Sequence, residues 1–228
     1  MISDRTPSVQ LPLFTYGEPA ENIIELLPIV WESTEALTSQ EALVRQHGID
    51  VILELGAQRV SPLVAYMIAC CIHDPDIYIR RRVIYILADL NKNLPGSKQI
   101  PESIRITVNN YLRKMSEEAI YGLLEVTVMD PLIDSSIYSI FISCPSGGKY
   151  LANIISEWDH PLAIRQKAIQ LVGKVGYMEA YPTLQRMLDR LEARHDGQFA
   201  MSFVPASIRS DEDIIPYLRA AILQLKSV

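Results

Sequence analysis

This chain of 228 residues is poor in cysteine and in long apolar runs, and each shortage excludes a class of protein. Its three cysteines, adjacent at Cys70 and Cys71 and single at Cys144, form neither a disulfide framework nor a Cys-x-x-Cys metal pair. The most apolar run, residues 63–72, is about half of the ~20 residues that a membrane helix needs. The N-terminus lacks the apolar region of a signal peptide. We therefore expect a cytoplasmic protein that does not enter the membrane.

Positive charge is also scarce. The chain has 21 Lys and Arg residues against 27 Asp and Glu residues, so its formal net charge is -6 at pH 7. Proteins that bind nucleic acid use clustered Lys and Arg to neutralise phosphates, so this balance argues against nucleic acid as the partner. A hydrophobic fraction of 49% and a charged fraction of 21% are typical of a folded domain with a sizeable core.

Residue types that hold metals are few and poorly spaced. The four histidines, His47, His73, His160 and His195, form no His-Glu-x-x-His pattern and no pair four residues apart on a helix. The Ser-Gly-Gly-Lys stretch at 146–149 lacks the Gly-x-x-x-x-Gly-Lys-Ser spacing of a phosphate-binding loop. We therefore expect no metal, no cofactor and no enzymatic activity.

Apolar residues recur at spacings of three and four along most of the chain, which predicts amphipathic helices. The predicted helices cover residues 20–33, 40–57, 62–73, 77–90, 101–115, 116–129, 132–143, 149–158, 162–175, 179–195 and 211–226. Residues 101–115 and 116–129 could be two helices or one bent helix. A strand pattern competes only around 199–204. Because the connections are mostly short, we expect antiparallel helical hairpins.

A short phrase recurs within this helical pattern. An aliphatic residue precedes Arg, two polar residues follow, and then come a small or β-branched residue and Ile. Copies with Arg45, Arg80 and Arg165 are joined by a fourth that has Asp134 in place of Arg, and the four positions lie 35, 54 and 31 residues apart. These separations bracket the ~33–47 residues of helical-hairpin repeats. Residues 91–115 account for the extra length of the longest separation.

Two kinds of position in the repeated unit carry structural predictions. The small residue, Gly48 or Ala168, should let two helices approach closely. An Asp in the turn before the phrase, at Asp74, Asp130 and Asp159, should cap the helix that follows.

The arginine of the phrase is predicted to be structural. Arg near a helix N-terminus is unfavourable for the helix dipole, so Arg45, Arg80 and Arg165 each need a compensating partner. Carbonyl groups of the turn, or the Asp of the neighbouring repeat, would supply one and join the repeats as a ladder.

These units, above all residues 159–176, resemble HEAT repeats and their short bacterial HEAT-like relatives. The resemblance implies an all-α fold: an armadillo-like, right-handed α-α superhelix, or solenoid, of about five hairpins in a single domain over residues 20–228. An extended arm, residues 1–19, would precede it, and residues 196–209 would be an insertion. The second helices would line a concave surface. The resemblance implies no activity, since the family consists mostly of scaffolds and adaptors.

We therefore expect a non-enzymatic scaffold or adaptor that binds a protein or peptide on the concave face. Positions of the repeat that point away from the core give the expected partner-binding residues: His47, Arg81, Arg82, Tyr85, Gln166, Lys167, Gln170 and Lys174. A mixed polar surface with Tyr and Arg suits a protein partner, because these residues are enriched in interface hot spots. A solvated face without a ligand is the alternative.

Two other functions stay open as alternatives. Helical-repeat alkylpurine DNA glycosylases have a similar length and build, but they need a basic groove with aromatic residues around a carboxylate, and only Trp158 with Asp159 suggests one. Some HEAT-like bacterial proteins act as bilin lyases, although no residue here singles out that role.

Two apolar segments outside the repeats, residues 9–16 and 198–205, need a packing partner. Each would cap one end of the array or contact another molecule, including a second copy in a homodimer.

Overall fold

The computed structural model describes residue 24 and residues 27–92, 100–198 and 213–227, with the side chains of 194–198 left aside. Every regular element in these ranges is helical, which confirms the all-α prediction. Nearly all of the predicted arm and insertion, including the competing strand pattern at 199–204, lies outside the described residues. Within the described ranges, no helix combines the length and the apolar character needed to cross a membrane.

Most predicted helices are present, with shifted ends. The α-helices are α1 (Pro28–Ala36), α2 (Ala42–Leu55), α3 (Pro62–Cys70), α4 (Ile77–Leu90), α5 (Glu102–Leu112), α6 (Glu117–Met129), α7 (Asp134–Ile142), α8 (Gly147–Ser156), α9 (Leu162–Val175), α10 (Tyr181–Gln198) and α12 (Ile215–Lys226). Short 3₁₀ turns cover Ala57–Arg59, Cys71–His73, Pro131–Ile133 and Met178–Ala180. Helices α4 and α9 have the predicted bounds, whereas α1 and α12 begin later than predicted.

Local sequence signals explain where these helices start and stop. The Ser61 hydroxyl accepts a hydrogen bond from the Val64 backbone N–H at 3.1 Å, and Pro62 occupies the first turn of α3. Gly56 and Gly176 follow α2 and α9 with φ values of 67° and 85°, a left-handed conformation that favours glycine and ends a helix.

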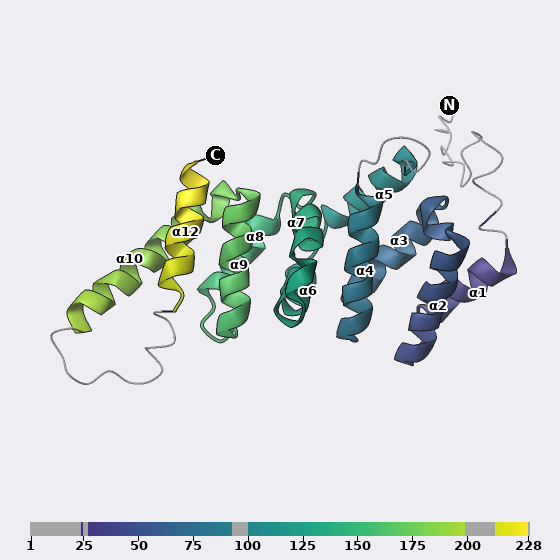
Figure 1. The fold of residues 1–228 in the computed structure, drawn as a ribbon, viewed down its shortest axis with the longest axis horizontal. Helices are drawn as coiled ribbons and strands as arrows, with labels where there is room; N and C mark the ends of the chain where they lie inside the picture. The colour runs from purple at the N-terminus through teal and green to yellow at the C-terminus, as the bar shows by residue number, and fades with distance from the viewer. Residues whose placement is uncertain (1–23, 25–26, 93–99, 199–212, 228) are drawn as a thin grey trace, which may run out of the picture.

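The helices form a row along the long axis of the molecule (Figure 1). Helices α2, α4, α9 and α12 follow one another along the row, and α6 with α7 lies between α4 and α9 (Figure 1). Pairs that follow each other in the chain pack together, as in α1 with α2, α8 with α9 and α10 with α12. Helix α5 packs on α3, and α1 lies at the opposite end of the row from α10 and α12.

A single apolar core runs through the whole row. It extends from Val30 in α1 to Leu225 in α12 and includes Ile84 and Phe141, which are completely buried. Burying a side chain of this size contributes about 1.5–3 kcal/mol, and most of this burial depends on the neighbouring helices. Each hairpin is therefore stabilised by those beside it.

Close helix approaches occur at two glycines. A Cβ atom on Gly48 would lie 2.7 Å from the Ser33 carbonyl oxygen of α1, so the predicted role of Gly48 is confirmed. A Cβ atom on Gly173 would lie 2.8 Å from the Ala221 Cα atom of α12, an approach that the repeated phrase does not reveal. Ala168 is completely buried.

Candidate partner-binding surface

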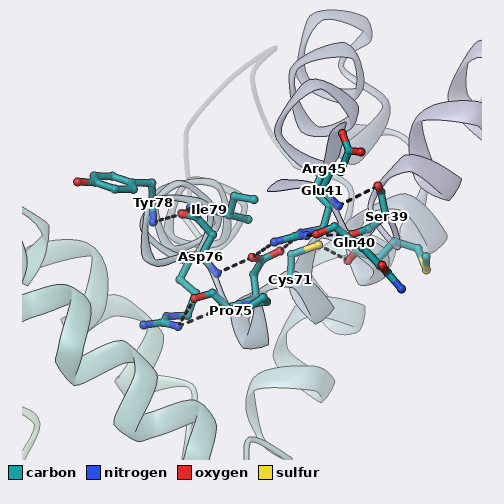
Figure 2. Close-up of polar contacts among 12 residues, drawn as sticks. Ser39, Gln40, Glu41, Arg45, Cys71, Pro75, Asp76, Tyr78 and Ile79 are labelled. Carbon is teal, nitrogen blue, oxygen red and sulfur yellow. Dashed lines mark hydrogen bonds and ion pairs between the residues drawn. The ribbon is translucent and has the colours of Figure 1, made fainter. Parts of the chain in front are cut away.

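The first arginine of the repeated phrase joins two hairpins. Arg45 on α2 donates from Nε and Nη2 to the two carboxylate oxygens of Asp74, at 2.6 and 2.7 Å. Its Nη1 donates to the carbonyl oxygens of Ser39 and Gln40, each at 2.9 Å (Figure 2). The side chains are only 8% and 4% exposed, and the hydrogen bonds to Asp74 raise the pKa of Arg45. The structural prediction for Arg45 is confirmed, with both expected kinds of partner.

The second arginine makes equivalent contacts one hairpin further along. Arg80 on α4 donates from Nη1 to the Asp74 carbonyl oxygen at 3.0 Å and from Nη2 to a Glu125 carboxylate oxygen of α6 at 2.7 Å. The bond from Arg80 to a turn carbonyl was predicted. The acidic partner was predicted to be the turn Asp of a neighbouring repeat, and it is Glu125 instead. A structural role for Arg80 is therefore confirmed.

The third arginine is held by a different set of groups. Arg165 on α9 donates from Nε to the Ile155 carbonyl oxygen at 3.1 Å, and its guanidinium lies 4.7 Å from the centre of the Trp158 ring. The Trp158 indole therefore packs on a buried arginine of its own chain. This contact gives Trp158 a structural role, which differs from the role beside a carboxylate that a DNA glycosylase would need.

The predicted caps are correct at only one of three turns. Asp76, and not Asp74, caps α4 by accepting two backbone hydrogen bonds. The Asp74 carboxylate pairs with Arg45 and accepts a hydrogen bond from the Asp76 backbone N–H at 2.8 Å. Asp130 caps the 3₁₀ turn at Pro131–Ile133. Helix α9 begins without a side-chain cap, so the prediction for Asp159 is wrong.

Two predicted binding residues on α4 form ion pairs with neighbouring elements. Arg82 pairs with Asp50 of α2. Arg81 pairs with Asp130, at the end of α6, over 2.7 Å from Nε to Oδ2. Arg81 and Arg82 therefore link α4 to elements on both sides, and their positive charges are neutralised locally.

Lys167 repeats this arrangement on α9. Its Nζ atom lies 3.0 and 3.1 Å from the two carboxylate oxygens of Asp134 on α7. Lys167 and Asp134 are thus a pair of opposite charge that bridges two adjacent helices.

A hollow of about 520 Å³ lies beside α4, on the side of α2. Its lining consists of Gln46, Asp76, Tyr78, Arg81, Arg82 and Tyr85. Three of these, Arg81, Arg82 and Tyr85, were predicted to bind a partner, and the Arg81 guanidinium lies 6.0 Å from the centre of the Tyr85 ring. Tyr78 is 67% exposed but is not among the predicted residues. The predicted outward positions all follow the arginine of the repeated phrase, whereas Tyr78 precedes it.

The remaining predicted residues lie elsewhere along the row. Gln170 and Lys174 line a second hollow of about 520 Å³ between α9 and α12. Gln166 donates to the Asp213 carbonyl oxygen at 3.4 Å, and His47 is exposed but lines neither hollow. The predicted set therefore does not form one site: three of its residues line the hollow beside α4, two line the hollow between α9 and α12, and three line neither.

Cys71, Cys144 and His160 have structural surroundings. Burial raises the pKa of Cys71 to about 12 and also raises the pKa of Cys144. His160 pairs with Glu157 at 2.8 Å and stacks on Tyr121, with 4.9 Å between ring centres. Among the residues whose positions are described, no three His, Cys, Asp or Glu side chains gather to hold a metal ion.

Comparison with known proteins adds no family to this geometry. No family model, no curated protein and no solved structure matches the chain. A functional assignment therefore depends on the surface itself.

Proposed function

We propose that this protein is a non-enzymatic scaffold that binds a protein or peptide along its second helices. In this proposal, five HEAT-like hairpins, α1–α2, α3–α4, α6–α7, α8–α9 and α10–α12, stack into a right-handed superhelix. Helix α5 is an additional element beside α3, which accounts for the longest separation between copies of the phrase. The row of helices in Figure 1 and the arginine contacts between hairpins support this arrangement.

The hollow beside α2 and α4, referred to below as the α2–α4 hollow, is the observation that carries the proposal. Its lining combines two partly exposed tyrosines with two arginines, the residue types that dominate binding hot spots. Asp130 and Asp50 hold Arg81 and Arg82 in place, so less side-chain entropy is lost when a partner binds. Because the same aspartates neutralise the arginines, the hollow favours a polar and aromatic protein surface over a polyanion.

The hollow between α9 and α12 supplies a second contact. Lys174 and Tyr217 line it, and no acidic partner of Lys174 is present among the described residues. A partner that follows the row of second helices would meet both hollows. The three free cysteines suit a reducing cytoplasm, where we place the protein.

Site-specific photo-crosslinking tests this proposal. A photoreactive amino acid replaces Tyr78 in the full chain, which is expressed in its native cells. The control is a second variant of the same chain that carries this amino acid at Ile106, which is 52% exposed on α5. We expect a covalent adduct from position 78 that is absent at position 106.

The captured partner then provides a quantitative test. The Tyr78→Ala/Tyr85→Ala variant should bind the purified partner at least about tenfold more weakly than the wild type, as is usual when hot-spot residues are truncated. Adducts that are absent, or identical at the two positions, would contradict the proposal. So would unchanged affinity of the double variant.

A further inference from the structure

A small polar pocket of about 150 Å³ lies between the end of α8 and helix α10, and it shares no lining residue with either hollow described above. Its lining consists of Ser156, Trp158, Thr183, Arg186, Met187 and Arg190, so it contains two arginines and no carboxylate. Pockets that enclose a whole small molecule measure about 300–1,000 Å³. This pocket therefore has room for a single chemical group.

The two arginines of the pocket stand one turn apart on α10. Side chains four residues apart on a helix are neighbours, so Arg186 and Arg190 place two positive charges close together. Neither forms an ion pair with a described carboxylate, whereas Arg81 and Arg82 on α4 each form one. Like charges at this spacing repel each other, so a bound anion would stabilise the pair.

The acidic residues nearest to these arginines on α10 bind other groups. Asp189 Oδ1 accepts a hydrogen bond from Gln185 Nε2 at 2.8 Å. Glu192 Oε1 accepts two hydrogen bonds from Arg219 of α12, at 2.8 and 3.0 Å. Neither carboxylate pairs with an arginine of the pocket, so the positive charge there is not neutralised by its own helix.

The groups that line the pocket are held in place. The Arg186 side chain folds back toward the start of α10: Nε donates to the Pro182 carbonyl oxygen at 3.2 Å, and Nη2 lies 3.5 Å from Thr183 Oγ1. No described group accepts from Nη1, whose N–H groups can therefore bind a ligand. Trp158 is fixed by its contact with Arg165. Such preorganisation lowers the entropy that is lost on binding.

We propose that this pocket binds one doubly charged phosphate group, either free phosphate or the phosphate of a monoester. Guanidinium N–H groups match phosphate oxygens in geometry, and two arginines balance two negative charges. A phosphate monoester carries a charge of about −1.5 to −2 at pH 7, which exceeds the single charge of a carboxylate or a phosphodiester. Two arginines in a chain of net charge -6 suit one phosphate and not a nucleic acid backbone. This inference does not depend on the proposed function.

Nuclear magnetic resonance of the full chain tests the proposal. The chain contains two tryptophans, so the indole N–H signal of Trp158 in the pocket can be compared with that of Trp31 on α1, at the other end of the row. The Trp31→Phe variant assigns the two signals. At low salt and pH ~8, where a phosphate monoester is doubly charged, the probes are inorganic phosphate and N-acetyl-O-phosphoserine amide. Both should shift the Trp158 signal to saturation and leave the Trp31 signal in place, and the tighter probe identifies the source of the phosphate.

Substitutions and singly charged probes make the test specific. Arg186→Gln and Arg190→Gln should each raise the dissociation constant about tenfold or more, because each removes hydrogen bonds to a charged group. The control is Arg113→Gln, at an exposed arginine after α5 that has no described ion pair; it changes the net charge equally and should leave the constant unchanged. Acetate and dimethyl phosphate should bind about tenfold more weakly than inorganic phosphate, because they carry one charge.

Three results would overturn the proposal. The Trp158 signal could stay in place, or shift without saturation, in both phosphate titrations. Arg113→Gln could weaken binding as much as Arg186→Gln does. The singly charged probes could bind as tightly as inorganic phosphate, which would show a general attraction for anions instead of a phosphate pocket.

Discussion

The buried pair of Arg45 and Asp74 gives the sharpest prediction about stability. Asp74→Asn preserves the shape of the side chain but removes its charge, leaving the Arg45 guanidinium in a site where it is 8% exposed. Removing one partner of a buried ion pair costs about 3–5 kcal/mol, because the remaining charge is not solvated. A folded domain is stable by only about 5–15 kcal/mol, so this variant should lose a large share of its stability.

The same substitution elsewhere in the chain is the control. Asp134 pairs with Lys167 on the surface, where the two side chains are 35% and 22% exposed. A pair that water reaches contributes about 0–1 kcal/mol, so Asp134→Asn should have a small effect. Urea unfolding followed by circular dichroism measures both values.

A double variant tests whether the cost comes from the stranded charge. Arg45→Met/Asp74→Asn removes both partners, so it should be more stable than Asp74→Asn alone. If Asp74→Asn and Asp134→Asn destabilise equally, or if the double variant is the least stable of the set, the reasoning about this pair is refuted.

Two further predictions concern the region around Tyr177. Gly147→Ala would place a Cβ atom 2.4 Å from the Tyr177 hydroxyl oxygen, so it should lower the free energy of unfolding in urea by about 1–3 kcal/mol. Gly122→Ala is the control: its nearest neighbouring atom would lie at 3.6 Å, so it should be neutral or stabilising by up to about 1 kcal/mol. Equal effects of the two substitutions would contradict this prediction. Burial raises the pKa of Tyr177 above its ordinary value of about 10. The protonated hydroxyl therefore stabilises the folded state below pH ~10, and this contribution is lost as the pH rises through the folded-state pKa. The free energy of unfolding should therefore fall above pH ~10, and in the Tyr177→Phe variant it should fall less steeply. The same slope in the variant and the wild type would show that Tyr177 is not responsible.

The sequence predicts well where signals are local or repeated. Helices α4 and α9 have the expected bounds because an Asp or Pro turn precedes each, and Gly176 ends α9. The repeated position of Arg45 and Arg80 after a turn was enough to predict their bonds to turn carbonyls.

Pairings between distant segments could not be predicted in this way. Asp134 is 33 residues from Lys167, and no spacing rule within one helix relates two such positions. The same limit applies to the turn before α4: both Asp74 and Asp76 suit a helix start, and no local pattern shows that Asp74 pairs with Arg45, 29 residues away. Tyr78 became a candidate only when the hollow beside α4 was seen.

The central claim is that the hairpins form a row whose second helices make one continuous binding platform. Spin labels introduced as unnatural amino acids at Glu54 of α2 and Leu223 of α12, both exposed, allow the distance between the ends of that row to be measured by pulsed electron resonance. Four steps between neighbouring helices of about 8–10 Å each predict a separation of about 32–40 Å. A distance under about 25 Å, as expected if the two end helices packed against each other, would contradict the row and the platform with it.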